Sequence, residues 1–206
     1  MSEVPPARGR PAPPQGRLWL TVCSLLALGM FAGALAPSSW WSWQPALAAS
    51  EPWRWWTAAF VHFSGAHFTG NLMALAAVAL FGRAARVPAA LTLAWLAAWP
   101  LTHLALLARP DLPLYGGLSG VLHAGVAVSA LFVARRGVGT ARRIGWIVLI
   151  GLAVKVAWET PWGPTLREDD WTGVPVVPWV HAAGLLAGLF AAMLALARDG
   201  SSGDRE

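Results

Sequence analysis

The chain has 206 residues, of which 56% are hydrophobic and only 12% are charged. A soluble domain carries roughly 25% charged residues, so this composition predicts an all-α membrane protein that crosses the bilayer several times. The net charge of +5 does not indicate a nucleic-acid partner, because the arginines stand in small groups between hydrophobic segments, as topology signals do. A single cysteine, Cys23, excludes an internal disulfide and a cysteine-based metal site.

A tail rich in proline and glycine, residues 1–17, is predicted to be disordered and cytoplasmic. Apolar runs then predict six membrane helices in one domain, residues 18–197, and a short cytoplasmic tail follows at 198–206. A signal peptide is the alternative for the first helix, but Pro37 directly after its end and the later spans favour a retained helix. The six helices are expected at about residues 18–36, 67–81, 89–107, 120–134, 144–158 and 177–197.

The long loop after the first helix is crowded with tryptophan and is expected to lie in the outer headgroup region. Six spans place both termini on one side of the membrane. Most arginines between the spans fall on that same side, so the positive-inside rule predicts cytoplasmic termini. The tryptophans of the loop are Trp40, Trp41, Trp43, Trp53, Trp55 and Trp56.

Three polar side chains are predicted to share one depth in the membrane. Ser119 precedes Arg135 by about 16 positions, His181 precedes Arg198 by about 17, and His67 precedes Arg83 by about 16, at 1.5 Å of rise per residue. Asn71 follows His67 by one helical turn, on the same face. Polar groups at such a depth face the interior of a helix bundle, where they pair or take part in chemistry.

Serine beside histidine is the minimal activated nucleophile, because the imidazole accepts the hydroxyl proton as the oxygen attacks a carbonyl carbon. We find no acidic residue at this depth to orient His181, so we expect a Ser119–His181 dyad rather than a triad. Asn71, His67 and the backbone N–H of Ser119 are the expected donors to an oxyanion. A hydrogen-bonded cluster that merely holds the helices together is the structural alternative.

Other classes of site are disfavoured. The sequence has no H-E-x-x-H motif, and no acidic residue is expected at the right level to complete a ligand set, so we predict no metal and no other cofactor. A transporter is disfavoured because we see no internal repeat. Lys155 and Glu159 are expected to pair near the outer interface in a structural role, and His103 is expected to be a packing residue.

Four segments in order resemble the signature of the rhomboid intramembrane serine proteases, which implies a six-helix rhomboid-like bundle. The resemblance implies that Ser119 is the nucleophile, that His181 is the general base, and that His67 and Asn71 line the oxyanion hole. The segments are Glu51-Pro-Trp53-Arg54-Trp-Trp-Thr57, His62-Phe-Ser-Gly-Ala-His67-Phe-Thr-Gly-Asn71, Gly117-Leu-Ser119-Gly120 and His181-Ala-Ala-Gly184-Leu-Leu-Ala-Gly188.

The resemblance also assigns supporting roles. Trp53 and Arg54 match the pair that braces the first loop of the family, although an interfacial anchor is an equal alternative on physical grounds. His62 either supports this loop or lies at the headgroups. Gly184 and Gly188 form a small-residue face that lets the last helix approach Gly120, so that His181 reaches Ser119.

His123 departs from the tyrosine that many bacterial rhomboids carry at this position. The pattern Gly-Leu-Ser-Gly-x-Leu-His is similar to that of the rhombosortase branch, whose members are thought to process exported proteins with a C-terminal Gly-Gly motif, a hydrophobic helix and a basic tip. His123 lies one turn after Ser119, so it either contacts His181 or is a buried packing residue.

These observations together predict an intramembrane serine endopeptidase of the bacterial inner membrane that opens to the periplasm. Its expected partners are membrane-anchored substrates with a C-terminal transmembrane tail, and the bilayer. A general rhomboid protease with other single-span substrates, and a rhomboid-like protein that binds transmembrane helices without cleaving them, are the alternatives.

Overall fold

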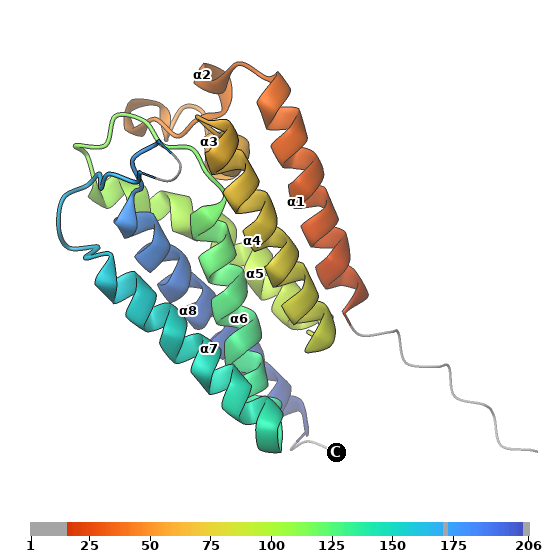
Figure 1. Ribbon diagram of the computed structural model, residues 1–206. Helices are drawn as coiled ribbons and strands as arrows, with labels where there is room; N and C mark the ends of the chain where they lie inside the picture. Colours follow the sequence, from red (N-terminus) through yellow and green to blue (C-terminus); the bar gives the residue numbers. More distant parts are fainter. Residues whose placement is uncertain (1–15, 171–172, 204–206) are drawn as a thin grey trace, which may run out of the picture.

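The computed structural model describes residues 16–170 and 173–203, and the regular secondary structure of this part of the chain is helical. Residues 1–15 of the predicted N-terminal tail lie outside the described residues, as do 204–206 of the C-terminal one. Six long α-helices form a bundle, and two one-turn helices lie at one end of it (Figure 1). The helices are α1 (Arg17–Leu35), α2 (Ser38–Trp41), α3 (Arg54–Thr57), α4 (Gly65–Ala84), α5 (Ala89–Leu104), α6 (Ser119–Arg136), α7 (Gly139–Trp158) and α8 (Pro178–Gly203), with 3-10 turns at Pro45–Leu47, Ala58–Phe60 and Ala105–Ala108.

The six long helices coincide with the six predicted apolar segments and differ mainly at their ends. α4 begins at Gly65 because the Ser64 side chain caps it by accepting the backbone N–H of His67. α8 continues to Gly203, past the predicted end of the span at residue 197. Four segments are long and apolar enough to cross a membrane, namely 17–35, 65–84, 89–108 and 178–199, so the count of six spans stays a prediction.

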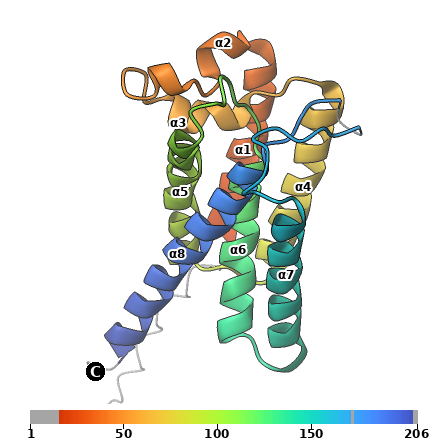
Figure 2. The same ribbon diagram turned by 90° about the vertical axis from the view of Figure 1, so that its left-hand side faces the viewer.

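α6 is the central helix of the bundle. It packs against α5, α7 and α8, and most of its side chains are buried (Figures 1 and 2). Many of these residues are small, which brings the neighbouring helices close. Trp95 of α5 shows how closely they approach, because its indole N–H donates to the Val121 carbonyl oxygen of α6 at 2.8 Å and its ring stacks on Trp19 of α1.

The predicted approach of the last helix to Gly120 is confirmed. A Cβ atom added to Gly184 of α8 would lie 2.0 Å from the Gly120 carbonyl oxygen, and one added to Gly188 would lie 2.6 Å from that of Ala124. These glycines therefore let α8 lie directly against the backbone of α6. This contact brings the first turn of α8 to the first turn of α6.

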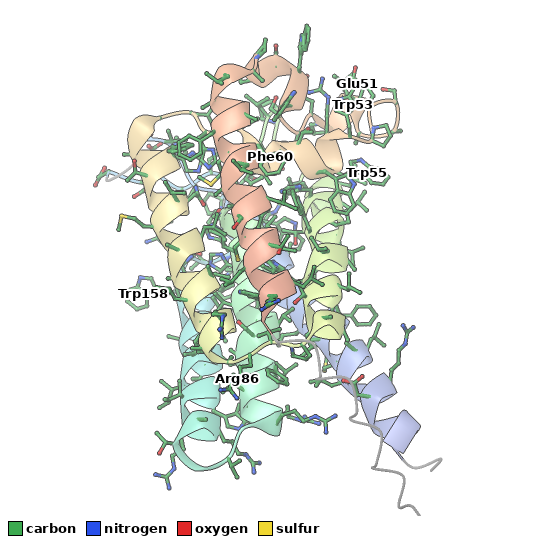
Figure 3. All side chains as sticks on the ribbon, turned by 90° about the vertical axis from the view of Figure 1, so that its right-hand side faces the viewer. Glu51, Trp53, Trp55, Phe60, Arg86 and Trp158 are labelled. Atoms are coloured by element: carbon green, nitrogen blue, oxygen red, sulfur yellow. The ribbon has the colours of Figure 1, made fainter. Side chains whose placement is uncertain are left out.

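The first loop is organised around Arg54, which is only 4% exposed. Its guanidinium donates to the carbonyl oxygens of Ser39 and Ser42, at 2.8 and 2.7 Å, and pairs with Glu51. Trp53, by contrast, is 51% exposed, and Figure 3 shows it with Glu51 at the same end of the bundle. Arg54 thus braces the loop, while Trp53 lies at its surface.

Candidate functional site

Ser119 and His181 meet where α6 and α8 begin. Ser119 Oγ lies 2.8 Å from His181 Nε2, across 62 positions of sequence. Ser119 is the first residue of α6, and His181 lies in the first turn of α8 and is 5% exposed. A hydroxyl at this distance from a ring nitrogen is placed for proton transfer.

Gly117 shapes the turn that leads into Ser119. Its φ of +145° lies in a region that side chains rarely adopt, and an added Cβ would lie 3.0 Å from His67 Nε2. The Tyr115 hydroxyl donates to the Gly117 carbonyl oxygen at 2.9 Å. Only glycine satisfies both the backbone conformation and the close approach of His67.

A cavity of about 180 Å³ opens onto Ser119 and His181. One wall comes from His67 and Phe63, and the other walls come from the two loops that precede α6 and α8. Its lining is mainly apolar and consists of Phe63, His67, Leu114, Tyr115, Gly116, Ser119, Leu166, Val174, Pro175, Val176, Val177 and His181. The cavity therefore has room for water next to Ser119 and His181.

His67 lies at the cavity, whereas Asn71 is placed behind it. The Asn71 side-chain amide donates to the His67 carbonyl oxygen of its own helix at 3.0 Å, and Asn71 is 6% exposed. The structure thus brings His67, Ser119 and His181 together, while Asn71 contacts the backbone that carries His67.

His62 packs against the loop and the first turn of α4, which is one of the two roles expected from the sequence. Its Nδ1 lies 3.2 Å from the Phe60 carbonyl oxygen, and its ring packs edge-on against His67 and Phe68, with ring centres 4.9 and 5.4 Å away. Burial and, to a smaller degree, the neighbouring His67 lower the pKa of His62 to about 4. His62 is therefore a neutral packing partner of His67 at pH 7.

His123 contacts His181, as one of the two sequence-based alternatives proposed. The two rings stack, with centres 4.2 Å apart and an angle of 11° between their planes, and His123 Nδ1 lies 2.7 Å from the Ser119 carbonyl oxygen.

His103 is fully buried, and its Nδ1 lies 2.6 Å from the Trp55 carbonyl oxygen, so it has the packing role that was expected.

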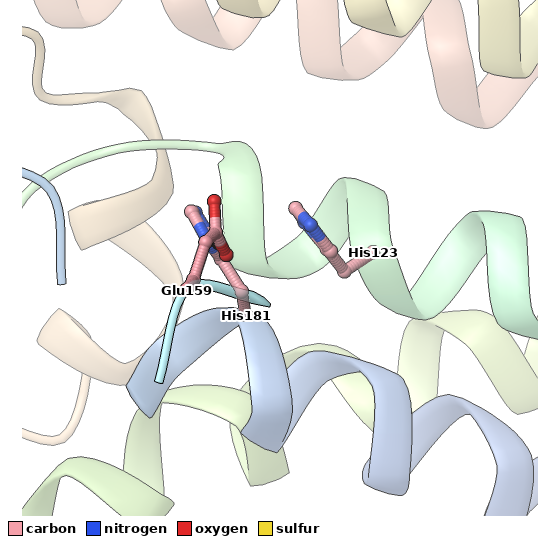
Figure 4. Close-up of side chains that lie close together, drawn as sticks. All are labelled: His123, Glu159 and His181. Atoms are coloured by element: carbon pink, nitrogen blue, oxygen red, sulfur yellow. Dashed lines mark hydrogen bonds and ion pairs between the residues drawn. The ribbon is translucent and has the colours of Figure 1, made fainter. Parts of the chain in front are cut away.

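The expectation that no acidic residue reaches the depth of His181 is wrong. Glu159, at the end of α7, places Oε2 2.7 Å from His181 Nδ1 (Figure 4). Its other oxygen pairs with Lys155 at 2.8 Å, so the predicted Lys155–Glu159 pair forms, but beside the catalytic candidates rather than apart from them. His181 is thereby flanked by Ser119 on one ring nitrogen and a carboxylate on the other.

Because Glu159 lies beside His181, the lack of an acidic ligand is no longer an argument against a metal site at this place. His123, Glu159 and His181 offer ligand atoms within 4.8 Å of one another. The Lys155 ammonium nitrogen lies among them, 2.8 Å from His123 Nε2 and 3.3 Å from His181 Nδ1. A positive charge thus already occupies the space between the three side chains, and the absence of a metal cofactor stays a prediction.

Counting depth on α7 would have found Glu159. Glu159 follows Arg143 by 159 − 143 = 16 positions, the same separation that relates Ser119 and His67 to their arginines. Glu159 was instead explained by Lys155, because an i, i+4 ion pair on a helix surface is sufficient reason for both charged residues to be present.

A comparison with known protein families finds a match for this chain. The family model for the rhomboid domain matches residues 49–198, nearly three-quarters of the chain, and the match includes all the residues around the cavity. No curated protein sequence matches this chain.

Proposed function

Because this chain belongs to the rhomboid family, a family of multi-pass intramembrane proteases, we propose that it is a serine endopeptidase in which Ser119 is the nucleophile and His181 the general base. The observation that carries the proposal is the 2.8 Å contact between Ser119 Oγ and His181 Nε2, two residues that line a cavity. A cluster that only held helices together would have no use for a cavity at its polar centre.

The contact supports an acyl-transfer mechanism. His181 Nε2 takes the Ser119 hydroxyl proton as Oγ bonds to the scissile carbonyl carbon, and returns that proton to the leaving amine as the C–N bond breaks. Water then attacks the acyl carbon: His181 Nε2 takes a proton from the water and gives it to Ser119 Oγ as the bond from Oγ to the acyl carbon breaks, which releases the new carboxyl terminus. In each tetrahedral intermediate the former carbonyl oxygen carries a negative charge, which hydrogen-bond donors must stabilise.

The donors we propose are His67 and the start of α6. His67 lines the same cavity as Ser119, and a Cβ added to Gly117, two residues before Ser119, would lie 3.0 Å from its Nε2. The first backbone N–H groups of a helix have no partner inside the helix, so the N–H of Ser119, the first residue of α6, is our second proposed donor to the oxyanion. Asn71 assists through the His67 backbone, to which its amide is bonded.

We propose that the substrates are exported proteins with a C-terminal Gly-Gly motif, a hydrophobic helix and a basic tip. His123 supports this choice, since it distinguishes the chain from rhomboids with a tyrosine at that position and resembles the rhombosortase pattern. The small volume of the cavity also suits a glycine-containing segment, which presents its backbone without large side chains. In this proposal the protein lies in the bacterial inner membrane, with both termini cytoplasmic and the cavity open to the periplasm.

A reporter experiment tests both the proposed protease activity and the proposed class of substrate. The protein is co-expressed with an exported reporter that carries the Gly-Gly, helix and basic tail, and the reporter mass is followed against Ser119→Ala. Ser119-dependent loss of the tail supports the sorting protease. An intact reporter, with Ser119 still labelled by a fluorophosphonate, indicates a rhomboid protease with other substrates. Absence of labelling favours the non-cleaving binder.

A further inference from the structure

The side chains around His181 form a closed chain of contacts that begins and ends on Ser119. His123 Nδ1 lies 2.7 Å from the Ser119 carbonyl oxygen, and His123 Nε2 lies 2.8 Å from Lys155 Nζ. Lys155 Nζ lies 2.8 Å from Glu159 Oε1, and Glu159 Oε2 lies 2.7 Å from His181 Nδ1. His181 Nε2 closes the chain on Ser119 Oγ.

This chain of contacts determines where the protons lie. A carbonyl oxygen only accepts, so His123 carries its proton on Nδ1 and accepts a proton of Lys155 on Nε2. Lys155 donates to Glu159, and the Glu159 carboxylate, at 2.7 Å, lies nearer to His181 Nδ1 than the Lys155 nitrogen does, at 3.3 Å, so it is the carboxylate that accepts the Nδ1–H of His181. His181 Nε2 is therefore without a proton and accepts the Ser119 hydroxyl, which is the form that a general base needs.

We propose that Glu159 is a positioning residue that completes a Ser119–His181–Glu159 triad, and that Lys155 and His123 hold its carboxylate in place. The proposal rests on the proposed function and deepens it, since a serine–histidine dyad needs no carboxylate. When His181 gains the Ser119 proton, the Glu159 carboxylate stabilises the positive imidazole that results.

The end of α7 is held so that Glu159 stays in this position. Glu159 ends the helix, and Thr160 after it has a φ of +52°, which a β-branched residue rarely adopts. Arg109 donates to the Pro161 carbonyl oxygen at 2.5 Å, and its guanidinium lies 5.1 Å from the ring of Trp179 in α8. Such an unfavourable backbone persists only where the surrounding contacts require it. The loop thereby ties Glu159 to the helix that carries His181.

Kinetics of purified full-length protein test the role of Glu159. Glu159→Gln keeps the shape of the side chain and removes its charge, so we expect fluorophosphonate labelling of Ser119 and kcat to fall by about 100-fold or more with KM unchanged. Glu159→Asp is expected to restore part of the rate, because it restores the carboxylate. Lys155→Met is expected to cost about tenfold, as for an outer partner that orients a catalytic histidine.

Glu168→Gln is the matched control, because Glu168 is an exposed carboxylate on the loop that follows Glu159. It is expected to label at the wild-type rate. A Glu159→Gln protein that keeps its labelling rate within about twofold, while Ser119→Ala is unlabelled, would overturn the triad and leave a dyad. A wild-type protein that is not labelled at all would instead overturn the proposed function.

A spectroscopic measurement tests the contact without activity. In protein with ¹⁵N-labelled histidine, the Nδ1–H of His181 bonded to a carboxylate is expected to give a strongly downfield proton resonance. The resonance should survive Ser119→Ala and disappear in His181→Ala and in Glu159→Gln. Its absence from the wild-type protein would overturn the proposal even if Glu159→Gln fails to fold.

Discussion

Gly184 lies so close to Gly120 that the α-carbon of one helix faces the carbonyl oxygen of the other without any side chain between them. An added Cβ at position 184 would lie 2.0 Å from that oxygen, far inside contact distance. His181 is one turn earlier on α8, so the separation of these two backbones sets the distance from His181 to Ser119.

Gly184→Ala is therefore expected to abolish or nearly abolish Ser119 labelling, because α8 must move away from α6. The added methyl group is also expected to lower the unfolding free energy by about 1–3 kcal/mol, as overpacking does. Gly151→Ala is the control, since a Cβ at Gly151 in α7 meets nothing within 4 Å. Equal labelling of the two variants would contradict the importance of this contact.

Ser119→Ala and His181→Ala are each expected to abolish cleavage and to leave the protein folded. The two residues act as one unit, so the double variant should be no less active than either single variant. Cleavage of the reporter by purified protein, with the thermal midpoint measured for each variant, checks this. Cleavage that survives both substitutions would end the proposal of Ser119 as nucleophile.

His67→Ala is expected to lower kcat more than Asn71→Ala does. His67 faces the cavity, whereas the Asn71 amide bonds the His67 backbone. Loss of one oxyanion donor costs about 3 kcal/mol, or roughly 100-fold in kcat, so we expect this from His67→Ala and a smaller, incomplete loss from Asn71→Ala. The reverse order would place Asn71, and not His67, next to the oxyanion.

The lowered pKa of His62 predicts that the folded protein becomes less stable in acid. Its pKa is about 4 in the folded protein, against about 6.5 for a free histidine, so the unfolded chain binds the proton more tightly. The unfolding free energy therefore falls as the pH falls from about 6.5 to about 4. His62→Gln removes this contribution, so its thermal midpoint should change less than that of the wild type between about pH 7.5 and about pH 5. An equal change in both proteins would show that His62 does not carry the effect.

The six long helices were predictable from the sequence because a membrane helix needs a long apolar run, and α1 and α4 to α8 contain such runs between arginines and prolines. Counting residues outwards from those arginines also placed His67, Ser119 and His181 on one level, and the structure brings these three side chains to one cavity.

Lateral contacts were harder to predict, because depth alone does not say which way a helix faces. Glu159 satisfies the same count, but its i, i+4 partner Lys155 offered a sufficient local explanation. Asn71 was predicted to share the face of His67, yet its amide bonds a carbonyl oxygen of its own helix. Trp53 and Arg54 have separate roles because of how the first loop folds back on itself, and the residues next to them in the sequence do not indicate this fold.

The pairing of Lys155 with Glu159 has an electrostatic consequence for the proposed chemistry. One positive and one negative charge lie side by side, so the resting site has no net charge from this pair. Transfer of a proton from Ser119 to His181 adds one cation and one anion, and the sum again does not change. In a medium of low dielectric, where an isolated charge costs several kcal/mol, the reaction then requires charge to be separated over a few ångströms and never a net charge to be created.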